Sequence, residues 1–377
     1  MTTYTVRYNY RIRPGKHAEA VLISEWHRCR WVWNQLATAR KQRRRLFTSA
    51  DLTAARAKHA WLREGSQNAQ ATMAYEFRGK GRRNLKSKRD LPSIPYTTRG
   101  FSIRDGRLRL AGGILIPVVW HRELPSQPTS VRVYRDPLGH WYASFVVRVN
   151  REPLPETGRA IGIDWGVKVA ATTTSPDHDY DSPQYAKTAK ADLTRYQRMM
   201  SRRKPKPGKA ASNGYKTAKL KVAKAHRKVA RQRLHDARRW ARKVVADHDV
   251  IAVEDFKPKM LAKTTMARKA ADQSVGMLRR ELETYARQAG RQVVNVPPAY
   301  TTMTCSECGA IAKTRLSLSE RVFQCYACGL ILDRDRNAAR TILATAERIR
   351  AGAETVRHSD LPSGSVGVQV EPESRPL

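Results

Sequence analysis

Four cysteines near the C-terminal end constrain the fold of this 377-residue chain more than any other feature. They form two Cys-x2-Cys pairs, Cys305 with Cys308 and Cys325 with Cys328, and 16 residues separate the pairs. This spacing is typical of a tetrahedral zinc site with four thiolate ligands. A glycine follows each pair, and its freedom at positive φ lets the backbone turn back toward sulfur. Because four thiolates leave no open coordination position, we expect a structural zinc ion.

The chain is also strongly basic, with 72 Lys and Arg against 33 Asp and Glu and a formal net charge of +39. Such a surface repels itself unless a polyanion neutralises it, and nucleic acid supplies a dense row of phosphates. An anionic membrane is the competing partner, but the longest apolar stretch, residues 112–120, is too short to span a bilayer. The amino terminus lacks the apolar core of a secretory signal. We therefore expect a cytoplasmic, nucleoid-associated protein that binds nucleic acid and no membrane.

Two basic segments are the candidates for contact with phosphate. The run at residues 40–45 extends a predicted helix. Residues 187–243 hold 21 Lys or Arg and two acidic residues, and a break rich in Pro and Gly predicts two helices there. The alternative interpretation is a helical face that is only solvated. The expected contacts are Arg43, Arg44, Arg202, Arg203 and Lys204.

Hydrophobic periodicity predicts a chain of several domains and of α+β class. Residues 3–13 alternate with the period of a strand, and a helical pattern follows in which Cys29 is expected to pack as a small buried hydrophobe. Hairpin patterns return before residue 150, one of them around an Asp-Gly turn. This order predicts a β-barrel of residues 1–13 and 95–155 that a helical domain, residues 14–94, interrupts.

Four carboxylates in the C-terminal half occupy positions where a negative charge needs an explanation, either within an apolar strand or at the start of a helix. Asp164 lies within an apolar strand and Glu254 ends another, whereas Asp333 and Asp335 begin the last helix. Taken singly, the first two are explained by salt bridges to arginine, and either of the last two by helix capping. Taken together, acids from two strands and one helix can converge on two Mg²⁺ ions. Mg²⁺ prefers hard oxygen ligands such as these carboxylates, and a site with two such ions can hydrolyse phosphodiesters.

The stretches that hold these acids resemble the transposon-encoded TnpB family, which is related to the type V CRISPR effectors. The matching segments are IGIDWGV at 161–167, IAVEDF at 251–256, and PAYTTMTCSECG through CYACGLILDRDRNAA at 298–339. A weaker likeness extends to YRIRP and WHRCRWVWNQL near the start, so the resemblance covers most of the chain except the tail. This sequence departs from the family pattern at a few residues beside these motifs, but it keeps every acid of the pattern.

This resemblance implies a split nuclease domain of RNase H-like (RuvC) fold, with the zinc ribbon inserted before the last acid. The nuclease domain would comprise residues 156–300 and 330–352, and the ribbon residues 301–329. The preceding barrel and helical domain would match the guide-holding (wedge-like) and recognition parts of the family. Residues 353–377 carry Ser, Gly, Pro and acidic residues without periodicity and are predicted to form a disordered tail.

The resemblance also implies cleavage of double-stranded target DNA directed by a guide RNA from the transposon end. We expect a monomer, although the sequence itself does not show whether one chain or two act. Its catalytic, Mg²⁺-binding acids would be Asp164, Glu254 and Asp335, because Asp335 keeps the Asp-x-Asn-Ala-Ala pattern of the family. Asp333 is the alternative third acid. Two other functions stay open: a nucleic-acid-binding protein whose acids are structural, and a guide-free nuclease or transposase.

Overall fold

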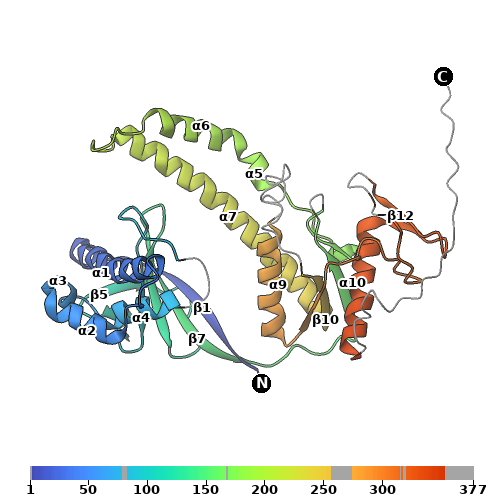
Figure 1. Cartoon of the computed structure of the whole chain (residues 1–377), viewed down its shortest axis with the longest axis horizontal. Coiled ribbons are helices and arrows are strands. Elements are labelled where there is room, and N and C mark those ends of the chain that lie inside the picture. The colour runs from blue at the N-terminus through green and yellow to red at the C-terminus, as the bar shows by residue number, and fades with distance from the viewer. Residues whose placement is uncertain are drawn as a thin grey trace. The chain divides into compact units, whose positions relative to one another are not determined.

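The computed structural model of the chain describes residues 2–78, 83–166, 169–255, 274–314, 316 and 320–352. The expected tail lies outside these residues. The chain divides into two compact units of mixed α and β structure (Figure 1). No helix in the described ranges has the length and apolar character needed to cross a membrane. The first unit comprises Met1–Pro153 and Tyr185–His235, and the second Leu154–Gln184 and Asp236–Leu377.

The first unit is built on an antiparallel sheet of seven strands in the order β2-β6-β7-β1-β5-β4-β3. The edge strands β2 and β3 are consecutive in the chain and only residues 98–100 join them, so the sheet curls into a nearly closed barrel, as the pattern predicts. The strands are β1 (Thr2–Ile12), β2 (Ser93–Thr97), β3 (Phe101–Arg104), β4 (Arg107–Leu110), β5 (Leu115–Val119), β6 (Ser130–Arg135) and β7 (Trp141–Arg151).

Four helices separate β1 from β2, which confirms the predicted helical insertion. The apolar stripe of the first helix is buried, and Cys29 within it is fully inaccessible. The prediction that this helix continues through the basic run is wrong. The helix ends at Lys41, and Arg43 adopts the left-handed conformation with φ 54°, which α-helical propagation excludes. The helices are α1 (Lys16–Lys41), α2 (Ser49–Lys58), α3 (Ala60–Arg63) and α4 (Gln67–Arg78).

The basic segment after the barrel forms two helices, as predicted, preceded by one short turn of helix. Arg227 of the last helix binds the β6–β7 turn, since its guanidinium donates to Asp136 Oδ2 at 2.9 Å and to the Tyr142 hydroxyl at 2.7 Å. This contact lies within the first unit, whereas the C-terminal end of the same helix belongs to the second. The helices are α5 (Tyr185–Thr188), α6 (Lys190–Arg202) and α7 (Asn213–Asp247).

The second unit has a four-stranded sheet in the order β11-β10-β8-β9, in which the first three strands are parallel and β9 is antiparallel to β8. One face packs on the C-terminal part of α7 and on α9, and the other on α10. Parallel strands covered on both faces explain why the sequence shows continuous apolar runs there. The elements are β8 (Ala160–Asp164), β9 (Thr172–Thr173), η1 (Pro176–His178), β10 (Val250–Glu254), α9 (Val275–Ala289), β11 (Gln292–Val296), β12 (Val322–Gln324), β13 (Ile331–Asp333) and α10 (Arg334–Arg350).

Helix α10 lies unusually close to β8. A Cβ atom on Gly162 would stand 2.1 Å from the Ala339 carbonyl oxygen and 2.9 Å from Leu343 Cβ, so the strand accepts no side chain at this position. The glycine of the IGID segment and the Ala-Ala pair of α10 therefore belong to one contact. That contact brings the start of α10 to the strand that ends on Asp164.

Candidate functional site

Two of the predicted acids end adjacent parallel strands. Asp164 is the last residue of β8 and Glu254 the last of β10, and the register pairs Ile163 with Val253 immediately before them. Both side chains therefore leave the sheet at the same edge. Both residues are buried, Asp164 with 6% and Glu254 with 9% of its surface exposed.

Asp335, in the first turn of α10, lies near the carboxylate of Asp164, as Glu254 does. Burial, together with the nearby carboxylates of Glu254 and Asp335, raises the pKa of Asp164 from its usual value of 3.8 to about 8. Burial also raises the pKa of Glu254. The structure thus gathers the three acids, 171 residues apart at the extremes (335 − 164), into one negative environment.

Asp333 has a different role from Asp335. It is the N-cap of α10, and its Oδ1 accepts the backbone N–H of Arg336 at 2.9 Å. Asp335 instead accepts hydrogen bonds from the guanidinium groups of Arg321 and Arg334, each at 3.0 Å at its shortest. Helix capping, which the sequence allows for either aspartate, belongs to Asp333 in the structure.

The donor set fits a divalent cation that prefers oxygen. Asp164, Glu254 and Asp335 offer hard carboxylate oxygens, and a cation among them would offset the repulsion that raises the pKa of Asp164. In the described part of the chain, the four cysteines form a tighter group than these carboxylates, since their four Sγ atoms all lie within 4.8 Å of one another.

Removing the charge of Asp164 is expected to stabilise the protein when Mg²⁺ is absent. Because its pKa is raised in the folded state, that state binds more protons than the unfolded state, and stability falls as pH rises from about 4 to about 8. One pKa unit corresponds to about 1.4 kcal/mol, so Asp164→Asn should raise the free energy of unfolding by at least that much at about pH 8. Urea unfolding without added Mg²⁺ measures the difference. A difference that stays constant between about pH 5 and about pH 8 would contradict the raised pKa.

The four cysteines form the second candidate metal site. The Sγ atoms of Cys305 and Cys328 are 3.6 Å apart, as are those of Cys308 and Cys325. A zinc ion with Zn–S bonds of about 2.3 Å requires edges of about 3.8 Å between the sulfurs of a tetrahedron. All five cysteines of the chain are described and free of disulfides. The cluster can therefore hold a structural zinc ion, and the glycines after each pair have the expected positive φ, 75° and 77°.

Two residues that the sequence analysis left without a role connect these sites. The Thr301 hydroxyl donates to Glu254 Oε1 at 3.1 Å. The Asn337 side chain bonds to the backbone of Thr304 and Ser306, beside Cys305. Asn337 was visible in the motif of the last helix, but no periodicity or spacing marks Thr301.

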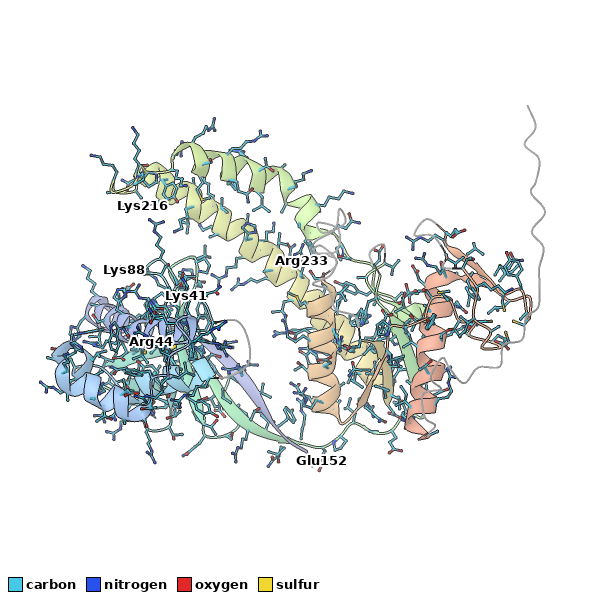
Figure 2. The ribbon with its side chains drawn as sticks, in the orientation of Figure 1. Lys41, Arg44, Lys88, Glu152, Lys216 and Arg233 are labelled. Carbon is cyan, nitrogen blue, oxygen red and sulfur yellow. The ribbon has the colours of Figure 1, made fainter. Side chains whose placement is uncertain are left out.

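The predicted basic contacts all lie in the first unit. Arg203 ties the loop after α6 to the start of α7, since its guanidinium donates to the Gly214 carbonyl at 3.2 Å, whereas Arg202 and Lys204 beside it are exposed. Arg43 and Arg44 are exposed after the end of α1, and Figure 2 shows Arg44 among the side chains of that region. Positive charge is thus available at both predicted places.

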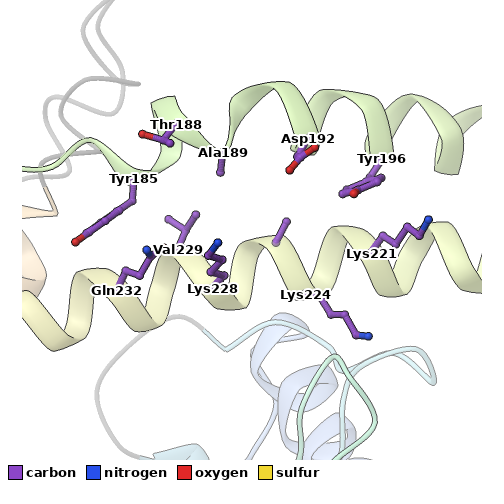
Figure 3. A pocket seen from close by; sticks show the side chains of 11 residues that line it. Tyr185, Thr188, Ala189, Asp192, Tyr196, Lys221, Lys224, Lys228, Val229 and Gln232 are labelled. Carbon is purple, nitrogen blue, oxygen red and sulfur yellow. The ribbon is translucent and has the colours of Figure 1, made fainter.

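A pocket of about 410 Å³ lies between α5 and α6 on one side and α7 on the other (Figure 3). Lysines of α7 and tyrosines of the shorter helices line it, and Lys221 Nζ is 5.6 Å from the centroid of the Tyr196 ring. Aromatic faces beside ammonium groups are a common arrangement in surfaces that bind single-stranded nucleic acid. The charged and aromatic lining residues are Tyr185, Asp192, Tyr196, Lys221, Lys224 and Lys228.

Comparison with known proteins agrees with this arrangement. A family model described as "Cas12f1-like, TNB domain" matches residues 276–342, and the OrfB_IS605 model, described as "Probable transposase", matches residues 144–265. A Streptomyces pristinaespiralis protein named "Putative RNA-guided DNA endonuclease" is 30% identical over 321 residues, which are 83% of this chain and 78% of that protein. This chain belongs to the TnpB family.

Other TnpB-family relatives and one solved structure extend the comparison. "Putative RNA-guided DNA endonuclease InsQ" of Escherichia coli (strain K12) is 30% identical over 236 residues, covering 58% of this chain and 57% of InsQ. The structure of a "Cas12f1-sgRNA-target DNA complex" superposes with a TM-score of 0.54 at 14% identity, over 87% of this chain and 83% of that one. At this identity the likeness is one of fold, and it confirms a mixed α+β architecture shared with Cas12f1.

Proposed function

We propose that this TnpB-family protein is an RNA-guided, metal-dependent endonuclease that cuts double-stranded DNA. The observation that carries the proposal is the meeting of Asp164, Glu254 and Asp335 at one edge of the second unit's sheet. A sheet with three parallel strands, one antiparallel edge strand and α10 on one face is consistent with the RNase H-like (RuvC) fold that the family resemblance implies. The relatives named as putative RNA-guided DNA endonucleases support the same reaction class.

Each part of the cluster has a separate task in this reaction. Two Mg²⁺ ions, when bound, would activate water and stabilise the leaving oxygen of the phosphodiester. Asp164, almost fully buried and under the electrostatic influence of both other carboxylates, would be one of the ligands. Glu254 presents its carboxylate from β10 under the restraint of Thr301. Asp335 completes the set from α10, and Arg321 and Arg334 limit the excess of negative charge beside it.

The domain limits and partners complete the proposal. Residues 1–13 and 95–155 would hold the guide RNA, 14–94 would contact the guide–target duplex, 156–300 and 330–352 would cleave, and 301–329 would form the zinc ribbon. The formal charge of +39 suits a channel that holds a heteroduplex by its backbone. Residues 185–235, which pack with the first unit, are an insertion between β9 and β10 of the cleaving domain. We propose that the protein acts as a monomer on the nucleoid.

Sequencing the nucleic acid that co-purifies with the protein, followed by cleavage of a plasmid library with that complex and Mg²⁺, tests the function. We expect one defined structured RNA and cuts at targets that match it and carry a common flanking motif. Random co-purified fragments with no cleavage would favour a nucleic-acid binder. Cleavage independent of the RNA would favour a guide-free nuclease.

A further inference from the structure

The hydroxyl of Thr301 is a hydrogen-bond partner of the Glu254 side chain. It donates to Glu254 Oε1 at 3.1 Å, and both residues are buried, Thr301 with 4% exposed. Burial raises the pKa of Glu254, and this hydrogen bond opposes that effect. A carboxylate held by one fixed donor in a buried site keeps one rotamer, so the bond sets where the second oxygen points.

The same segment is fixed to the helix that carries Asp335. Asn337, fully buried and two residues after Asp335, donates from Nδ2 to the Thr304 carbonyl at 2.8 Å and accepts the Ser306 N–H at 2.9 Å. Thr341, one turn further along α10, also donates to the Thr304 carbonyl at 3.1 Å. Between these contacts lies Cys305, a member of the four-cysteine cluster.

Residues 301–306 thus touch β10 through Thr301, α10 through Thr304 and Ser306, and the cysteine cluster through Cys305. Nothing in four-thiolate zinc ligation requires the first and second of these contacts, because the thiolates of Cys305 and Cys308 would anchor the knuckle by themselves. The Thr301–Glu254 bond is buried and the bonds to Thr304 and Ser306 are partly buried, and a buried hydrogen bond lost without replacement is costly.

We propose that residues 301–306 are a positioning element for the carboxylate site, with Thr301 as the positioning residue of Glu254. A zinc ion bound at Cys305 would then hold the segment whose Thr301 hydroxyl orients Glu254 and whose backbone is bonded to the helix that carries Asp335. This inference rests on the proposed function for the role of the carboxylates. It assigns the ribbon a part in building the nuclease site besides any contact with nucleic acid.

Binding of Mn²⁺ to the full zinc-loaded chain, freed of nucleic acid and followed by electron paramagnetic resonance, tests the proposal. Thr301→Val keeps the shape of the side chain and removes the donor. We expect it to weaken Mn²⁺ binding about tenfold, the lower end of the effect of removing a ligand's hydrogen-bond partner. Zinc content and the thermal unfolding midpoint should stay close to those of the unaltered protein. Thr301→Ser, which restores the donor, should recover the affinity.

Two comparisons separate this proposal from the proposed function. Thr302→Val, at the neighbouring and partly exposed threonine, is the matched control and should bind Mn²⁺ normally. If Thr301→Val binds Mn²⁺ normally while Asp164→Ala does not, the positioning role is refuted and the carboxylate site stands. If Asp164→Ala also binds normally, the carboxylate site itself is refuted. If Thr301→Ser is as weak as Thr301→Val, the hydroxyl is not the cause, and the positioning role fails.

Discussion

Asp335→Asn is expected to reduce cleavage of target DNA about a thousandfold or more, because charge stabilisation by a catalytic metal is worth several kcal/mol and each 1.4 kcal/mol is about tenfold in rate. The substitution keeps the size of the side chain and removes the negative charge that faces Asp164. Guide RNA and target DNA should still bind. Single-turnover cleavage by the complex, beside a gel-shift measurement of target binding, gives both quantities.

Asp333→Asn is the matched control for this experiment. Asn caps a helix about as well as Asp, so the bond to the Arg336 N–H and the start of α10 should survive, and cleavage should stay close to that of the unaltered protein. Asp333→Ala, which loses the cap, should cost about 1 kcal/mol of stability and little activity. Full activity in Asp335→Asn, or an equal loss of activity in Asp333→Asn, would show that Asp335 is not the third acid.

The sequence predicts the pair of strand acids better than the helix acid, for a geometric reason. An apolar parallel strand that ends on a carboxylate places that carboxylate at a known edge of the sheet, so two such strands predict a meeting of Asp164 and Glu254. At a helix start, residues two positions apart point about 200° away from each other, and spacing does not show which one faces the sheet. Only the packing of α10 against Gly162 decides that orientation.

Contacts between distant segments were the part that local patterns did not reveal. Thr301 and Glu254 are 47 residues apart, and a threonine in an irregular segment carries no periodic signal. The end of α1 at Lys41 was also missed, because Lys, Gln and Arg all favour helices and only the left-handed backbone at Arg43 stops the helix. The cluster of four cysteines, by contrast, was predictable, since the geometry of each knuckle is encoded within four consecutive residues.

Affinity for nucleic acid is expected to fall about a thousandfold or more between roughly 50 and 200 mM salt, because binding through many phosphate contacts releases many counterions. The loop between α6 and α7 allows a local test. Arg202→Gln with Lys204→Gln should weaken binding to all sequences alike and reduce the slope of log affinity against log salt by about two, since each phosphate contact contributes about 0.9. Arg203 is left unchanged because it holds the loop to Gly214.

The charge-preserving variant Arg202→Lys with Lys204→Arg is the control for that test and should keep the original slope. The comparison decides between the two interpretations of the basic helices, because a merely solvated face contributes no counterion release on binding. An unchanged slope in the glutamine variant would mean that these two side chains touch no phosphate. The net charge of +39 would then act through other parts of the chain, and the steep salt dependence of the whole protein would persist without them.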